Sequence, residues 1–447
     1  SAQPAPTVLD SSEKQAFTAI FQAIKAQNWV EAEKLIDKAP QGPMAAMARA
    51  EYYLAPNSPK VDAERLQTLL QSAPYLPQAE QLATMAKKRG ADALPDRPGI
   101  RRFSWLGGAP KRDLPANAAS DSLRIELQVF IKNDDPASAE RLLESKAADL
   151  STDALTELRY RVAWSFYIEN DDFSAKRLAG VARAAGGEWA TQASWAYGLA
   201  SWRLKDYAAA FEAFDSVARL AANDDLKAAG LFWSARAAIA AKQPQQVQPR
   251  MQQAAKLPET FYGLLASESL GMEPIAKKAA KISKLDWNAL KNEKNALLAV
   301  ALTEVGQTKL AEEALRHQAK IGDAAQHANL AQLAGSLNLA STQYWMGHYG
   351  PSRDQSNAMA RYPMPNWEPT GGWRVTPSLV YAHALQESTF RTDVVSPAGA
   401  RGLMQVRPGT AQDIARARGN SFVASELDRP SVNLEYGQSY LEKLRDM

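Results

Sequence analysis

The stretch SWAYGLASWRLKDYAAAFEAF, residues Ser194–Phe214, decides the fold that we expect for much of this chain. Its polar and apolar residues recur with a helical period, as they do over most of the sequence. Gly198 has no side chain, so it lets two helices approach closely. Tyr207 falls at the turn, and Ala210 and Phe214 fall in the interface. The stretch therefore predicts two short helices that pack against each other.

Copies of this pattern occur earlier in the chain. Phe173 stands 34 residues before Tyr207 in an equivalent place, and 34 is the period of the tetratricopeptide repeat, which the stretch resembles. Asn133–Pro136 matches Asn170–Phe173, and Asn28–Ala32 is a fainter copy. Because the copies are degenerate, we expect an α-solenoid rather than a regular array.

Proline and glycine mark the boundaries of this array. The basic segment 90–119 predicts a long loop, and the segment 362–372 predicts a break before a compact C-terminal part. We expect an all-α protein with three domains. Residues 1–282 form a superhelical, tetratricopeptide-like solenoid, residues 283–366 a helical linker domain, and residues 367–447 a smaller domain of a different kind.

Composition excludes several functions. The net charge of +3 argues against a dedicated nucleic-acid binder, and the absence of cysteine excludes disulfides, thiolate metal sites and a cysteine nucleophile. The four histidines form no metal-binding pair, so we expect no metal and no organic cofactor. We also expect no transmembrane segment, because no apolar run is long enough.

The run Thr376–Ser388 predicts a helix, since a hydroxyl residue at the cap is followed by proline at the first helical position. Val380, Ala384 and Glu387 share one face of it. Glu387 is thus expected at the edge of an apolar face and near the helix C-terminus. Burial and the negative end of the helix dipole would both favour the protonated acid, as a general acid requires.

A glycine-containing loop follows this helix. Gly399 and Gly402 in Ser396–Gly402 let backbone amides approach a ligand, and Gln405 offers a donor and an acceptor. Asp393 is expected to be a turn residue. Glu387 therefore has no obvious second carboxyl group near it in the sequence. Most glycosidases use two carboxyl groups, but a single one suffices if the substrate supplies the second group.

These residues resemble a known catalytic signature, that of the soluble lytic murein transglycosylases. The resemblance rests on Glu387-Ser388, on Ser396-Pro-x-Gly-Ala-x-Gly-Leu-Met-Gln405 and on Pro408-x-Thr-Ala411. Outside the signature, Phe261–Ala266 and Tyr362–Trp367 look like linker segments of that family, and the solenoid looks like its superhelical, ring-forming domain.

The resemblance implies an activity and a fold. Members cleave the β-1,4 bond between N-acetylmuramic acid and N-acetylglucosamine in peptidoglycan without water, and the product carries a 1,6-anhydro ring. It implies a lysozyme-like C-terminal domain in which Glu387 is the single catalytic acid. Ser396 would support the substrate's N-acetyl group or an intermediate, Gln405 would contact a sugar, and Met404 would lie in the same binding segment. Glycan strands would be the partner, and the bacterial periplasm the location, free or associated with the membrane.

Two departures from the family stand out. Arg407 replaces a methionine that packs on a sugar, so it either meets a substrate carboxylate or faces solvent. The family's Ala-Tyr-Asn-Ala-Gly motif is absent up to Met447, which predicts a lysozyme-like domain incomplete at its C-terminus. The alternative function is a helical scaffold without enzyme activity that binds proteins or glycan strands.

Overall fold

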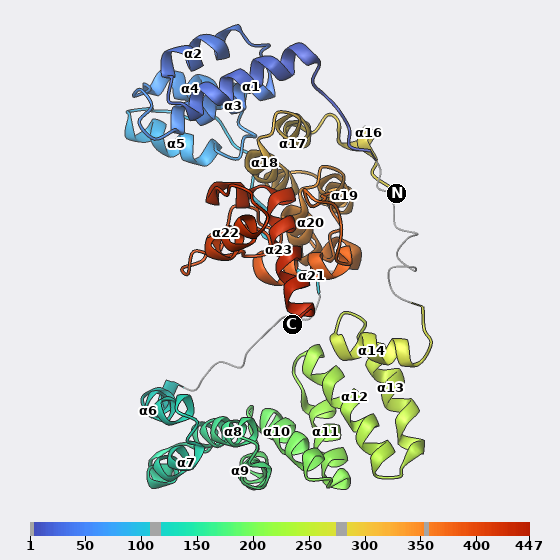
Figure 1. The fold of residues 1–447 in the computed structure, drawn as a ribbon. Helices are drawn as coiled ribbons and strands as arrows, with labels where there is room; N and C mark the ends of the chain where they lie inside the picture. Colours follow the sequence, from blue (N-terminus) through green and yellow to red (C-terminus); the bar gives the residue numbers. More distant parts are fainter. Residues whose placement is uncertain (1–3, 108–117, 274–283, 353–356) are drawn as a thin grey trace. The chain divides into compact units, whose positions relative to one another are not determined.

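The computed structural model describes residues 4–107, 118–273, 284–352 and 357–447. The predicted all-α class is confirmed, because helices make up nearly all the regular secondary structure of the described residues, with one two-stranded ribbon besides them (Figure 1). The chain folds into two compact units. The first comprises residues 1–107 and 282–447, and the second comprises residues 108–281. The domain boundaries expected from the sequence stay predictions.

The second unit is a succession of helices. They are α6 (Asp121–Lys132), α7 (Pro136–Ser145), α8 (Thr152–Ile168), α9 (Asp172–Ala184), α10 (Ala190–Arg203), α11 (Tyr207–Leu220), α12 (Asp224–Ala240), α13 (Val247–Ala255) and α14 (Phe261–Ser269), with the short 3₁₀ turns η1 (Ala118–Ser120), η2 (Ala147–Asp149) and η3 (Pro244–Gln246).

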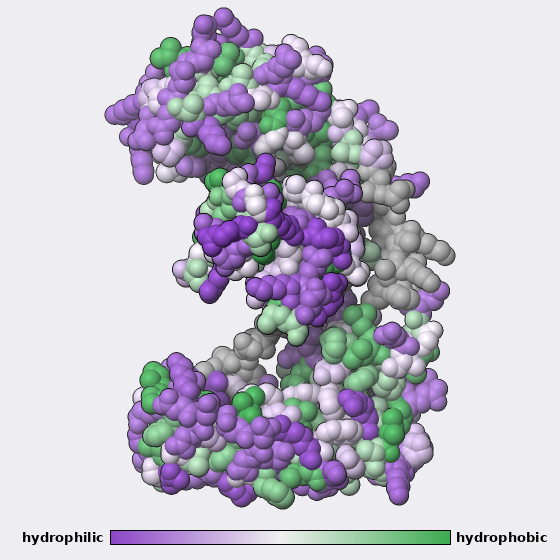
Figure 2. All heavy atoms as spheres, viewed as in Figure 1, coloured by the Kyte–Doolittle hydropathy of each residue, from purple (hydrophilic) through white to green (hydrophobic). Residues whose placement is uncertain are grey.

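The close approach predicted between α10 and α11 is present. A β-carbon at Gly198 would lie 2.6 Å from the Cε1 atom of Phe214, so only glycine fits there without a shift of the ring. Figure 2 shows hydrophobic residues over α14, where Phe261 and Leu264 are exposed.

The copies noticed in the sequence share one turn. In each, a residue with positive φ precedes an Asp or Asn whose side chain caps the next helix. The pairs are Gln27-Asn28, Asp134-Asp135, Asn170-Asp171 and Lys205-Asp206. The repeat in the sequence is therefore a repeated way of starting a helix.

The first unit draws on both ends of the sequence. Its helices are α1 (Ser11–Lys25), α2 (Trp29–Lys38), α3 (Pro43–Leu54), α4 (Ala63–Ser72), α5 (Ala79–Lys88), α16 (Trp287–Leu290), α17 (Lys294–Glu304), α18 (Thr308–Ile321), α19 (His327–Ser336), α20 (Ala340–His348), α21 (Pro377–Ser388), α22 (Pro408–Ala417) and α23 (Pro430–Arg445), with the 3₁₀ turns η4 (Ala324–Gln326), η6 (Ala358–Arg361) and η7 (Ala424–Asp428).

One hydrophobic core joins α1–α5 to α17–α20. It runs from Phe17 to Ala86 and continues from Leu285 to Ala360. Glu304 at the end of α17 reinforces this junction, because its carboxylate accepts hydrogen bonds from the backbone N–H groups of Val8 and Leu9 at 2.9 and 3.1 Å. Segments almost 300 residues apart in sequence are thus packed together.

The predicted loop 90–119 contains a short strand, which the sequence did not indicate. In the antiparallel ribbon of β1 (Ser104–Trp105) and β2 (Tyr349–Gly350), Trp105 pairs with Tyr349, and their rings meet edge to face at 5.3 Å. Residues 108–117 of that loop lie outside the described part of the chain.

Two small cores hold the region of α21–α23 together. One contains Val380 and Tyr381 of α21 with Leu434 of α23, and it also includes Ala340 of α20. The other forms around Val406 and Leu427. Figure 2 shows mostly hydrophilic side chains over α22 and α23 on the side viewed.

Candidate active site

Helix α21 carries the candidate acid. It runs from Pro377 to Ser388, as predicted, with Thr376 at its N-cap, although the Thr376 side chain makes no capping hydrogen bond. The buried positions are Val380, Tyr381, Ala384 and Ser388.

Glu387 lies on α21 beside those positions and is exposed. The predicted burial of Glu387 is therefore wrong. At ~100° per residue, Ser388 rather than Glu387 continues the buried face. The carboxylate stands at the rim of the apolar face, on its solvent side.

Ser388 fastens the end of α21 to the loop that follows. Its Oγ lies 2.8 Å from the carbonyl oxygen of Leu403 and 3.0 Å from that of Ala384, either of which accepts its hydrogen. Thr389 and Phe390 both have positive φ, which is uncommon for such residues. They reverse the chain at once, and Phe390 is buried. The position of Glu387 is thus fixed by its neighbour.

Ser396 closes a tight turn. Its Oγ accepts a hydrogen bond from the N–H of Ala400 at 3.0 Å, and its own N–H donates to the carbonyl of Ala400 at 2.8 Å. Gly399 completes the turn with φ +78°, a conformation that side chains disfavour. Because the hydroxyl is held as an acceptor, its hydrogen is left for donation to a ligand.

Gln405 is built into the same loop. Its Nε2 donates to the carbonyl oxygens of Val394 and Gly402 at 3.1 and 3.0 Å, and its backbone has φ 47°. The sequence predicted a donor and an acceptor for a ligand, whereas the structure commits the amide hydrogens to the loop. Only the side-chain carbonyl is left to accept a hydrogen bond.

The two other candidate residues differ in burial. Met404 is half-buried, and its thioether packs over Gly437 of α23. Arg407 is exposed at the N-cap of α22, where its carbonyl accepts from the N–H of Ala411 at 3.1 Å. Met404 thus contributes to packing, and Arg407 faces solvent in this structure.

Asn433 of α23 holds the loop around residues 401–404 in place, and the sequence analysis did not identify it. It is fully buried on α23. Its Oδ1 accepts from the N–H of Met404 at 2.8 Å, while its Nδ2 donates to the carbonyls of Arg401 and Leu427 at 2.9 and 2.8 Å. All its amide atoms are used to shape the turn, and the sequence around it, which holds other polar residues, gave no signal for this role.

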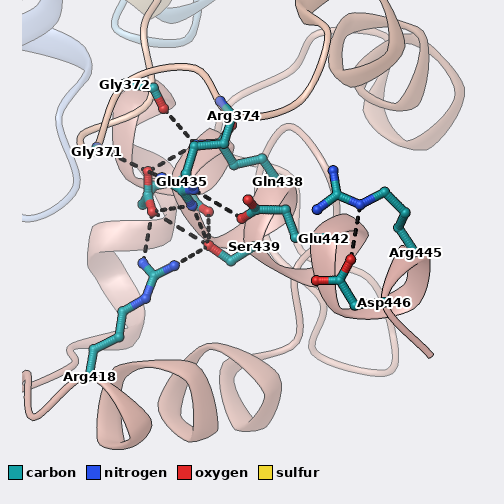
Figure 3. A network of polar contacts seen from close by, with 10 residues as sticks. All are labelled: Gly371, Gly372, Arg374, Arg418, Glu435, Gln438, Ser439, Glu442, Arg445 and Asp446. Atoms are coloured by element: carbon teal, nitrogen blue, oxygen red, sulfur yellow. Dashed lines mark hydrogen bonds and ion pairs between the residues drawn. The ribbon is translucent and has the colours of Figure 1, made fainter.

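A second buried group, Glu435, was also missed (Figure 3). Its carboxylate accepts from Arg374 at 2.8 and 3.2 Å, from Arg418 at 2.7 Å, and from the N–H of Gly371 at 3.0 Å. Gln438 adds a donor at 3.1 Å. Burial alone would raise the pKa of Glu435, but these hydrogen bonds outweigh it and lower the pKa to about 2. The network joins the segment before α21 to α22 and α23.

Together these contacts gather three segments. The end of α21, Val394 in the loop and the turn 402–405 are hydrogen-bonded to one another through Ser388 and Gln405. Asp393 is exposed in the same loop. Across the described ranges, no three acidic or histidine side chains gather as metal ligands would.

Comparisons with known proteins converge on this region. The family model described as the transglycosylase SLT domain matches residues 366–447. The soluble lytic murein transglycosylase of Escherichia coli is 41% identical over 76 residues, which cover 16% of this chain and 12% of that relative. The endo-type membrane-bound lytic murein transglycosylase A of Klebsiella pneumoniae is 41% identical over 88 residues, or 19% of this chain and 43% of that protein. The matches thus span less than half the length of these relatives.

Solved structures extend the likeness to the whole fold. The 70 kDa soluble lytic transglycosylase of Escherichia coli superposes with a TM-score of 0.55 at 16% identity, covering 98% of this chain and 87% of that one. An inactive glutamate-to-glutamine variant of the lytic transglycosylase Slt from Pseudomonas aeruginosa gives 0.54 at 20% identity, covering 97% and 63%. At such identities the likeness establishes the fold.

Proposed function

Because this chain belongs to the soluble lytic transglycosylase family, we propose that it cleaves the β-1,4 bond between N-acetylmuramic acid and N-acetylglucosamine in peptidoglycan and leaves 1,6-anhydro ends. The observation that carries the proposal is the attachment of the α21 end to the turn 402–405 through Ser388, inside the matched domain. It presents Glu387 beside a hydrogen-bonded loop whose remaining polar groups can orient a sugar.

In the proposed mechanism Glu387 acts first as an acid. It donates a proton to the glycosidic oxygen as the bond to the sugar carbon breaks, and the positive charge that develops on that carbon is stabilised by the substrate's acetamido oxygen. The Ser396 hydroxyl would donate a hydrogen bond to that acetamido group. The inactive glutamate variant of the Pseudomonas relative supports an essential glutamate.

Glu387 then acts as a base. It removes the proton of the sugar's 6-hydroxyl, whose oxygen attacks the same carbon and closes the anhydro ring. A well-oriented intramolecular nucleophile has an effective concentration of roughly 10⁵ M or more, so it competes with water. Glu387 is exposed, and we expect a bound glycan to help to cover the carboxyl and exclude water.

Gln405 and Arg407 would serve substrate binding in different ways. The side-chain carbonyl of Gln405 would accept a hydrogen bond from a sugar hydroxyl or amide. Arg407 is exposed beyond the loop and would contact an acidic group of the polymer. No helix among the described residues is long and apolar enough to cross a membrane. We propose the periplasm as the location, because peptidoglycan lies there.

Digestion of purified cell-wall sacculi tests the activity. The products are identified by mass, and anhydro ends, lighter than hydrolysed ends by one water, are expected. Glu387→Gln should abolish release while leaving the unfolding free energy within about 0.5 kcal/mol, since the side chain is exposed. Glu64→Gln, an exposed glutamate on α4, is the matched control and should cleave normally.

The outcomes separate the two functions. Hydrated ends would reject the transglycosylase mechanism, and an unchanged rate for Glu387→Gln would remove that residue from it. Binding of sacculi without any release would instead favour the helical scaffold.

A further inference from the structure

A polar pocket lies in the first unit, next to the candidate site. It has a volume of about 410 Å³ and is lined by residues 306–316, which include the first part of α18, by Ser341 of α20 and by residues 391–393, which follow α21. Its volume falls within the ~300–1,000 Å³ of typical ligand pockets. Such pockets are mostly apolar, whereas this one is lined by glycine and by polar or charged residues alone.

The charges in this pocket balance. Three cations and three anions line it, namely Lys309, Arg316, Arg391, Glu312, Glu313 and Asp393. A lining of this kind disfavours an apolar ligand and gives no overall preference for an anion or a cation. It favours a ligand that carries both charges.

The floor of the pocket is pre-organised. Arg316 donates from Nε to the hydroxyl of Thr342 and from Nη2 to that of Ser341, each at 3.0 Å. The Thr342 hydroxyl in turn donates to the carboxylate of Glu312 at 3.2 Å. Both charged groups are therefore held in place before any ligand arrives.

Like charges act on one another within the pocket lining. Burial raises the pKa of Glu312, and the negative charge of Asp393 adds to the rise against the opposing effect of Arg316. Burial lowers the pKa of Arg316, and the positive charge of Arg391 adds to the fall against the opposing effect of Glu312. Helix α18 and the loop after α21 thus each contribute a guanidinium group and a carboxyl group to one pocket, and each pair of like charges interacts unfavourably.

We propose that this pocket binds a zwitterionic peptide segment, with a carboxylate between Arg316 and Arg391 and an ammonium group between Glu312 and Asp393. Such a ligand relieves both repulsions at once. Peptidoglycan is a glycan that carries short peptides, and residues 391–393 follow Glu387 by only a few positions. The ligand is therefore the peptide branch of the substrate, an assignment that rests on the proposed function.

Calorimetric titration with a free peptide tests the pocket. The probe is N-acetylated Ala-Glu-Lys, which has two carboxylates and one ammonium group. Binding to the full chain is expected, and it should weaken about tenfold or more when the lysine is acetylated or when both carboxylates are amidated. Equal binding of the modified peptides, or none of the parent peptide, would overturn the proposal.

Two variants locate the binding site. Asp393→Asn and Arg391→Gln are each expected to weaken binding about tenfold, whereas Arg416→Gln, which alters an arginine that is 73% exposed and lies outside the pocket, should not. Arg391 also donates to the carbonyl of Ser388 at 3.0 Å, so its variant is checked for folding by circular dichroism. Asp393→Asn removes only a charge in an exposed loop, and wild-type binding by that variant would refute the site.

Failure of the pocket is distinguishable from failure of the proposed function. The titration does not depend on cleavage. If the chain releases anhydro products but does not bind the peptide, only the peptide-binding proposal is rejected. If the chain binds the peptide and releases no products, the proposed pocket stands and the proposed cleavage activity is rejected.

Discussion

The thioether of Met404 occupies the space that a β-carbon at Gly437 would take. Met404 is half-buried against both small cores of the α21–α23 region, so this contact couples the turn 402–405 to α23. The absence of a side chain at 437 is what lets the loop sit so close to the helix.

Gly437→Ala should therefore destabilise this region. The new methyl group displaces Met404, and overpacking of this kind costs about 1–3 kcal/mol. Urea denaturation measures the change, and Met404→Ala in the same chain should restore part of it. Gly409→Ala is the control, because a β-carbon at Gly409 meets nothing within 4 Å in a helix. It should be neutral or stabilising by up to ~1 kcal/mol. Equal losses at both glycines would contradict the close contact.

Glu435→Gln should cost more, about 3–5 kcal/mol, because it leaves Arg374 and Arg418 partly buried without their anion. The glutamate also predicts an acid dependence. Its pKa falls from an ordinary 4.5 to about 2 on folding, so its contribution is complete above pH 4.5 and is lost as the pH falls toward 2.

Urea denaturation between pH 7 and pH 3 checks this dependence. The contribution of Glu435 to the wild-type unfolding free energy should fall by about 2 kcal/mol by pH 3, so the decline with pH should be shallower in Glu435→Gln. Glu426→Gln, in an exposed i,i+3 pair with Arg429, should change stability by less than about 1 kcal/mol. Parallel acid profiles for wild type and Glu435→Gln would show that Glu435 is not the group responsible.

Tyr381→Phe should weaken the anchorage of α21. The phenol of Tyr381 donates toward the carbonyls of Pro365 and Trp367 at 2.7 and 2.9 Å, and losing it costs about 1–3 kcal/mol. Burial raises the pKa of Tyr381 to about 12. The group's contribution is therefore present below pH 10 and lost as the pH rises toward 12.

Alkaline unfolding curves test this. The unfolding free energy of the wild type should decline between pH 10 and pH 12, and this decline should be smaller in Tyr381→Phe. Tyr440→Phe, at a side chain 44% exposed, should behave like wild type.

Gln405→Glu should distort the loop that carries Ser396. The change removes the amide hydrogens that Val394 and Gly402 accept and sets a carboxylate against two carbonyl oxygens, which costs about 1–3 kcal/mol or more. Urea denaturation of the purified variant measures the loss of unfolding free energy. Gln412→Glu, on the exposed side of α22, should stay within about 0.5 kcal/mol. A stable Gln405→Glu protein would mean that the amide does not hold the loop.

Local signals in the sequence were reliable. Proline after Thr376 set the start of α21, and the similar segments around Asn28, Asp135 and Asp171 marked one repeated helix cap. Gly198 was predicted at a close approach and lies against Phe214. These features depend on neighbours within about one repeat, so periodicity and capping rules can find them.

Long-range pairings were not predictable in this way. Arg374 and Glu435 are 61 residues apart, and neither carries a local signal for the other. The prediction that Glu387 is buried was wrong, because helical periodicity does not determine how wide the buried face of a helix is. Ser388, which donates to the carbonyl of Leu403, lies on the buried face instead. Such features follow from which segments the tertiary fold brings together.

The core shared by α1–α5 and α17–α20 has a consequence for synthesis on the ribosome. The roughly 200 residues between Ala86 and Leu285 take about 10–40 s to translate at ~5–20 residues per second. During that interval α1–α5 have been synthesised but α17–α20, with which they pack, have not. The second unit is continuous in sequence, so its helices can pack with one another as they are made. The nascent N-terminal helices are thus the segment on which a chaperone would act.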